Sequence, residues 1–242
     1  MAHTLITSKL AYCLPAFYPF SFAQGLRRRH VDMIEDGVCG STTSITKVYD
    51  ILCFSCISAI KRLERRKKIG GRHAFVVINE SKFHHKRKYN HGRSGRTWRR
   101  THSWVFGMLE VEATLRRPIL KLVRHRSRRS LLAIIWKYAV GGSHILSDCW
   151  RAYNTLQQQG FIHSQVNHRR FFVHPQTSAH TQHLERAWHT YKEELYHYRG
   201  NLSKQSFQGS LKVIEWNYWL GKEHRHGPLG RLFHDLRKDY KV

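Results

Sequence analysis

Acidic residues are scarce in this sequence: its 242 residues hold 16 Asp and Glu against 42 Lys and Arg, a formal net charge of +26. A charge of that size calls for a polyanionic partner, and nucleic acid is the first candidate. Charge alone does not separate an enzyme acting on nucleic acid from a structural RNA-binding protein. Because 41% of the residues are hydrophobic and 12% aromatic, a disordered basic tail is excluded and a folded chain is predicted.

Long apolar runs and paired cysteine motifs are also missing. No run of 18 apolar residues occurs, so we predict no membrane span. The 5 cysteines are an odd number, and the single C-x-x-C pair, Cys53 and Cys56, has no second pair of ligands at zinc-finger spacing. We therefore predict free thiols in a reducing compartment.

Hydrophobic periodicity and turn residues predict the elements and their order. We expect helices over 43–68, 126–140, 149–160, 180–198 and 204–220, and strands over 75–79, 103–111, 118–123, 144–148 and 161–167. The first three strands follow one another directly and suit an antiparallel meander. The last two are each reached through a helix and suit parallel addition by right-handed crossovers. The sequence thus predicts an α/β fold with a five-stranded mixed sheet flanked by helices, in which the first and fourth strands are neighbours.

The domain organisation follows from the same pattern. Residues 1–42 show no clean periodicity and are interpreted as a poorly specified N-terminal extension. Residues 43–71 form a basic helical segment, which we interpret as part of a reduced DNA-binding module. Residues 72–220 form the main domain, and 221–242 a basic C-terminal tail.

Two clusters of cations are candidates for phosphate contact. Residues 84–100 hold seven Lys or Arg, three His and no acid, and their glycines favour a loop. A solvated loop is the plain alternative, but cations without a single acid favour phosphate binding. A second cluster follows the third predicted strand. The predicted nucleic-acid-binding residues are Lys86, Arg87, Lys88, Arg93, Arg96, Arg99, Arg100, Arg124, Arg126, Arg128 and Arg129.

Isolated polar residues stand where strands end in this basic background. Asp148 is the single acid between residues 113 and 184, and it follows the fourth predicted strand. Glu185 lies near the start of a predicted helix, and Lys192 follows seven residues later on the same helical face. Asn79 ends the first predicted strand. Phosphodiester cleavage and strand transfer use two divalent cations about 4 Å apart, and such cations prefer carboxylate oxygens.

Five motifs in order resemble the transposase domain of Merlin-type DNA transposons and their ISXO-type insertion-sequence relatives: NESKFHHKRKYNHG, WVFGMLE, SDCWRAYNTL, VNH and HTQHLERAWHTYKEEL. The resemblance covers about residues 43–220. It implies an RNase H-like fold and a DDE-type active site with metal-dependent cut-and-paste chemistry. Asp148 falls on the family's second acid, Glu185 on its third, and Lys192 on the basic residue that follows the third. The implied metal is Mg²⁺ or Mn²⁺, with Asp148 and Glu185 as ligands.

The first acid of that pattern is absent. Where the family has Ile-Asp-Glu-Ser, this sequence has Ile78-Asn79-Glu80-Ser81. An amide oxygen carries no charge, so two dications would be poorly neutralised. Because successive side chains of a strand point to opposite faces, Glu80 is expected to face away from the site. We therefore expect metal binding and catalysis to be severely weakened.

The resulting prediction is a transposon-derived DDE-type transposase domain that binds DNA and is catalytically impaired. A domesticated or decaying non-enzymatic DNA-binding protein and a structural RNA-binding protein stay open as alternatives. Without the other motifs, Asp148 would be interpreted as a helix N-cap and Glu185 as a surface charge. The expected partner is DNA, either transposon ends or non-specific duplex. A homodimer stays open, and neither a membrane nor a small-molecule cofactor is expected. The expected location is the nucleus, or the cytoplasm for a bacterial source.

Overall fold

The computed structural model describes residues 40–83, 104–166, 182–196 and 204–240. The chain divides into two compact units, one formed by Glu64–Tyr196 and the other by Met1–Leu63 with His197–Val242. The predicted basic loop over 84–100, and almost all of the predicted N-terminal extension, lie outside the described residues.

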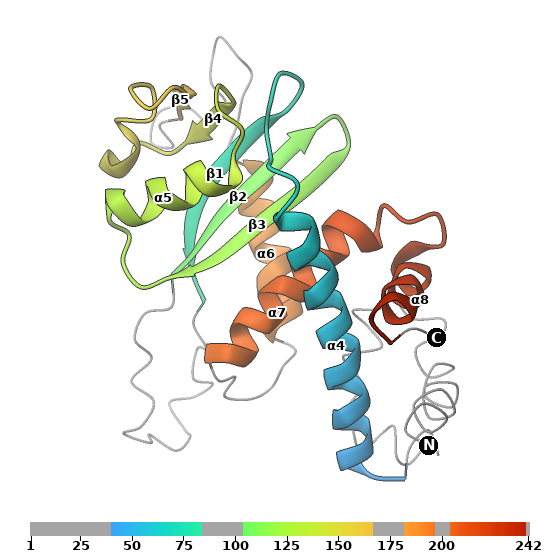
Figure 1. Ribbon diagram of the computed structural model, residues 1–242. Helices are drawn as coiled ribbons and strands as arrows, with labels where there is room; N and C mark the ends of the chain where they lie inside the picture. The colour runs from blue at the N-terminus through green and yellow to red at the C-terminus, as the bar shows by residue number, and fades with distance from the viewer. Residues whose placement is uncertain (1–39, 84–103, 167–181, 197–203, 241–242) are drawn as a thin grey trace, which may run out of the picture. The chain divides into compact units, whose positions relative to one another are not determined.

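The first of these units contains a five-stranded mixed sheet (Figure 1). Its strands are β1 (Phe75–Lys82), β2 (Trp104–Glu112), β3 (Leu115–Val123), β4 (His144–Ser147) and β5 (Ile162–Gln165), in the order β3-β2-β1-β4-β5. β1 pairs with β2, and β2 with β3, in antiparallel register, whereas β4 is parallel to both β1 and β5. The predicted meander, the parallel additions and the pairing of first and fourth strands are all confirmed. This order is that of the RNase H-like fold.

Helices cover both faces of the central strands. α5 (Arg128–Tyr138) and α6 (Gln182–Tyr196) lie on opposite sides of the sheet in Figure 1. The central strands are accordingly apolar without alternation, and the run from Val76 to Ile78 is fully buried. From α5, Leu131 and Ile135 enter the core. Each such side chain contributes about 1.5–3 kcal/mol through burial.

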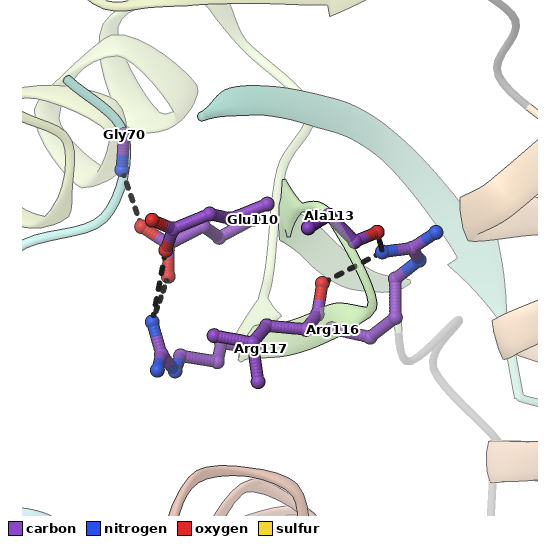
Figure 2. A network of polar contacts seen from close by, with 7 residues as sticks. Gly70, Glu110, Ala113, Arg116 and Arg117 are labelled. Atoms are coloured by element: carbon purple, nitrogen blue, oxygen red, sulfur yellow. Dashed lines mark hydrogen bonds and ion pairs between the residues drawn. The ribbon is translucent and has the colours of Figure 1, made fainter. Parts of the chain in front are cut away.

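A buried carboxylate attaches the entry loop to the sheet. Glu110 of β2 accepts a hydrogen bond from the Gly70 amide at 2.9 Å and pairs with Arg117 of β3 at 3.1 Å (Figure 2). Gly70 has φ +90°, and a Cβ at this position would overlap Ser143, so both conformation and space require glycine. The network holds the loop that leads into β1 against β2.

The segment predicted as a helix over 149–160 is different in the structure. It contains only the short 3-10 helix η3 (Arg151–Tyr153), followed by turns up to Gly160. Most of its backbone bonds run from residue i+3 to residue i, as from the Leu156 amide to the Tyr153 carbonyl at 3.0 Å. Tyr153 and Leu156 are fully buried, and this three-residue spacing suits the tighter turn.

The described part of the second unit is helical. It contains α4 (Thr42–Glu64, whose last residue belongs to the sheet unit), α7 (Lys204–Trp216), the π-helical turn η4 (Asn217–Gly221) and α8 (Gly227–Tyr240). Trp216 and Trp219 are buried. α8 was not predicted, because its cations led residues 221–242 to be interpreted as a tail. Its Leu232 and Leu236 are nevertheless buried at helical spacing.

By length and composition alone, α4 is long and apolar enough to cross a membrane. The sequence had predicted no membrane span, because it holds no run of 18 apolar residues. Core helices of soluble proteins pass the same test, so this is weak evidence.

Burial raises the pKa of the Cys53 thiol to about 11 and that of Cys56 well above its usual value. Both cysteines, and Cys149, are free thiols as predicted.

Candidate active site

Asn79 lies on the face of the sheet that α6 covers. In the antiparallel register Asn79 is opposite Gly107 of β2, and directly paired residues point to the same face. A Cβ on Gly107 would overlap the indole of Trp188, which comes from α6. The Asn79 side-chain oxygen accepts a hydrogen bond from the Glu80 amide at 2.6 Å.

Asp148 directly follows β4 and is close to β1 in register. β1 and β4 pair in parallel up to Val77 and Leu146, and continuing this register by two residues aligns Asn79 with Asp148. The carboxylate of Asp148 accepts a hydrogen bond from the Trp150 amide at 3.1 Å. This bond caps the turn that leads into η3, so the capping role considered for Asp148 is present in the structure.

Glu185 and Lys192 are placed by α6. Trp188 is buried against the sheet, and Glu185 precedes it by three residues while Lys192 follows it by four, so all three share one side of the helix. Glu185 is exposed. Lys192 is half-buried, with its ammonium 5.5 Å from the centre of the Phe83 ring, and burial lowers the pKa of its amino group.

The fold therefore places Asn79, Glu185 and Lys192 on one side of the sheet, and Asp148 at the end of β4, beside β1 in register. The remaining prediction, that these residues act in catalysis, stays a prediction.

Glu80 is directed to the opposite face. It is paired with Phe106 in the register, one residue out of phase with Asn79 and Gly107. Its side chain is 3% exposed, accepts a hydrogen bond from the Tyr153 hydroxyl, and lies 3.8 Å from Arg126. Burial, followed by the negative charge of Asp148, raises the pKa of the Glu80 carboxyl, and the contacts with Tyr153 and Arg126 oppose this rise. The expectation that Glu80 faces away is confirmed.

Arg126 makes contacts that the sequence did not indicate. Its guanidinium lies 3.8 Å from the ring centre of Trp104 and 4.9 Å from that of Trp150. With the Glu80 carboxylate nearby, these stacked contacts hold the guanidinium in place. Sequence reasoning assigned Arg126 to DNA, because nothing local pairs an arginine with tryptophans that lie 22 and 24 residues away.

The other predicted DNA-contacting arginines of this region are exposed. Arg124, Arg128 and Arg129 lie where β3 leads into α5, and Arg128 also donates to the Arg151 carbonyl at 3.4 Å. The seven predicted cations of 84–100 lie outside the described residues.

A serine–histidine pair adjoins Asp148 and was not identified from the sequence. The Ser147 hydroxyl donates to the Asp148 carbonyl at 2.8 Å, so it accepts from Nε2 of His163 at 2.8 Å. Burial, and then the charge of His144, lower the pKa of His163, which favours the neutral ring. The pair links β5 to the end of β4 and so supports the position of Asp148.

The donor set does not fit a pair of divalent cations. Within the described residues, no three His, Cys, Asp or Glu side chains come together as a metal site. The amide of Asn79 takes the place of one carboxylate, and Glu80 is turned to the other face. Two carboxylates and a neutral amide are a poor match for two dications.

Comparison with known proteins identifies the family. The model of the ISXO2-like transposase domain matches residues 66–218, well over half of the chain. No curated protein matches it.

Two solved structures are similar to this chain, both with low sequence identity and low TM-scores. One is a chain of the simian T-cell lymphotropic virus intasome in complex with PP2A regulatory subunit B56 gamma, at 17% identity and TM-score 0.39, covering 70% of this chain and 56% of that chain. The other is the catalytic core domain of BIV integrase, at 16% identity and TM-score 0.36, covering 70% and 99%. The present chain thus spans little more than half of the intasome chain. With its five-stranded mixed sheet and the match over 66–218, the chain belongs to the family of ISXO2-like transposase domains.

Proposed function

We propose that this chain is a DNA-binding transposase domain whose metal-dependent strand cleavage is impaired at Asn79. The observation that carries the proposal is the opposite orientation of Asn79 and Glu80. The amide lies on the α6 face with Glu185 and Lys192, whereas the neighbouring carboxylate of Glu80 is bound by Tyr153 on the other face. No carboxylate of β1 therefore replaces the missing acid.

DNA binding is supported by charge. The net charge of +26 is accompanied by the exposed Arg124, Arg128 and Arg129 beside the candidate site. Lys and Arg that contact phosphates release counterions, so the affinity should fall steeply with salt, by about 10³-fold or more between 50 and 200 mM for six or more contacts. The finer assignment to Merlin-type elements, and a nuclear location, rest on the five sequence motifs.

The test has a binding arm and a cleavage arm. Affinity for a labelled duplex is measured in the presence of a chelator across that salt range. Cleavage and strand transfer are then followed with Mg²⁺ or Mn²⁺ for the natural protein and for Asn79→Asp. Asn154→Asp is the matched control, because Asn154 is exposed and the substitution adds the same charge.

Salt-steep binding with cleavage only by Asn79→Asp supports the proposal. Equal cleavage by the natural protein contradicts the impairment. A flat salt dependence contradicts binding through the cations. Tighter binding to RNA of the same length favours a structural RNA-binding protein.

A further inference from the structure

α8 presents a basic face outside the matched transposase domain, which ends at residue 218. Leu232, Asp235 and Leu236 are buried on one side of this helix. On the other side the exposed residues recur at helical spacing and are Phe233, His234, Arg237 and Lys238.

The two acids of α8 itself are neutralised inside the unit. Asp235 is 1% exposed, accepts from the Trp216 indole at 2.8 Å and pairs with Arg231 through two bonds of 3.0 Å. Asp239 pairs with Arg62 at 2.6 Å. Among the described residues, by contrast, Arg237 and Lys238 have no acidic partner. The acids thus stabilise the fold, and the outward cations are left unbalanced.

The turn before α8 adds to this positive surface. Arg225 and His226 are exposed, and the rings of His224 and His226 lie 5.8 Å apart. Burial lowers the pKa of His224, and the positive charges around it lower it further; these belong to His226, Arg231, Arg225 and His234. Positive charges from both the turn and the first part of α8 therefore act on His224.

We propose that this α8 surface, formed by Phe233, His234, Arg237 and Lys238 with Arg225 and His226, is a second DNA-binding surface that contacts the phosphate backbone. The choice of DNA as the polyanion rests on the proposed function. The location of the surface on α8 is argued from the structure and does not depend on that proposal. Cations in the last turn also favour the helix dipole, by about 0.3–1 kcal/mol each. The dipole does not explain the cations of the preceding turn. It also does not explain why Asp235 and Asp239 are paired within the unit, while Glu223 is exposed.

The experiment compares two double variants of the full chain. Arg237→Gln/Lys238→Gln removes two charges from the α8 surface. Arg72→Gln/Lys137→Gln removes two charges from exposed cations, one before β1 and one on α5, outside the basic clusters and the 43–71 segment. Affinity for a labelled DNA duplex is measured over a range of salt, and thermal unfolding confirms that both variants are folded.

Each lost phosphate contact should reduce the slope of log affinity against log salt by about 0.9. We expect the α8 variant to lose about 2 in slope and roughly 30- to 100-fold in affinity near 0.1 M salt, and the control to lose much less. Equal losses in the two variants, or none in the α8 variant, overturn the surface but leave the proposed function standing. Loss of RNA binding without loss of DNA binding also overturns it. A natural protein that binds no DNA overturns both.

Discussion

The Tyr153 hydroxyl donates a hydrogen bond to the Glu80 carboxylate, joining η3 to β1 on the sheet face opposite α6. The residue next to the missing acid is therefore committed to a structural contact. Its companion Asn79 remains on the α6 face without a charge. β1 therefore presents no carboxylate on the α6 face.

Replacing Tyr153 with Phe should destabilise the domain. The substitution removes the donor from a carboxylate that is 3% exposed, and leaving a buried polar group without its partner costs about 1–3 kcal/mol. Urea unfolding measures the change. Tyr240→Phe on α8 is the control, because Tyr240 is half-exposed, and it should shift the unfolding free energy by less than about 0.5 kcal/mol. Equal effects of the two variants would show that the hydroxyl of Tyr153 contributes nothing.

Glu80 should make stability depend on pH. Its folded-state pKa is raised, mainly by burial, so the native state keeps a proton that the unfolded state has lost. The stabilisation is complete below the unfolded pKa of about 4.5 and is lost as the pH rises through the folded pKa. Relative to Glu80→Gln, the natural protein should therefore lose stability as the pH rises above about 4.5. Unfolding free energies at several pH values check this, and a relative gain with rising pH would refute it.

Gly107 should be intolerant of a side chain. A Cβ there would overlap Trp188, which positions α6 and with it Glu185 and Lys192. Gly107→Ala is expected to cost about 1–3 kcal/mol, the usual range for overpacking a core. Gly141 is the matched control, since a Cβ there meets nothing within 4 Å. If Gly107→Ala unfolds at the same temperature as Gly141→Ala, the packing of α6 on β2 is not as described.

The Glu110–Arg117 pair should behave as a coupled unit. Arg117→Met leaves a buried carboxylate without its cation, with a cost of about 3–5 kcal/mol for a fully buried pair and less here, because Arg117 is 14% exposed. Adding Glu110→Gln should restore part of the loss, so the double variant should be more stable than the two single changes predict by addition. Strict additivity in chemical unfolding would mean that the pair is not coupled.

The sheet could be predicted because its central strands are apolar on both faces and are separated by recognisable turns. The candidate site could be located because Asp148 follows β4 and Asn79 lies on β1, and the topology makes these strands neighbours. The predicted end of the first strand at residue 79 was too early, since β1 continues to Lys82. Both inferences depend on signals local in the sequence together with general rules of connection.

Three features could not be predicted. The contact between Tyr153 and Glu80 depends on the folded arrangement of segments 73 residues apart. The segment after Asp148 has helical composition, but its buried residues favour turns of three residues. The helical spacing of Leu232 and Leu236 could have indicated α8. The surrounding cations instead led to the interpretation of this segment as a tail.

The most direct test of the central claim is the rate of Mn²⁺-dependent cleavage of a labelled duplex by Asn79→Asp relative to the natural protein. If the missing carboxylate alone disables the centre, the substitution should raise the rate by about 100-fold or more, while Asn154→Asp leaves it unchanged. A natural protein that cleaves as fast as Asn79→Asp would contradict the account, because Asn79 or Glu80 would then serve the metal ions.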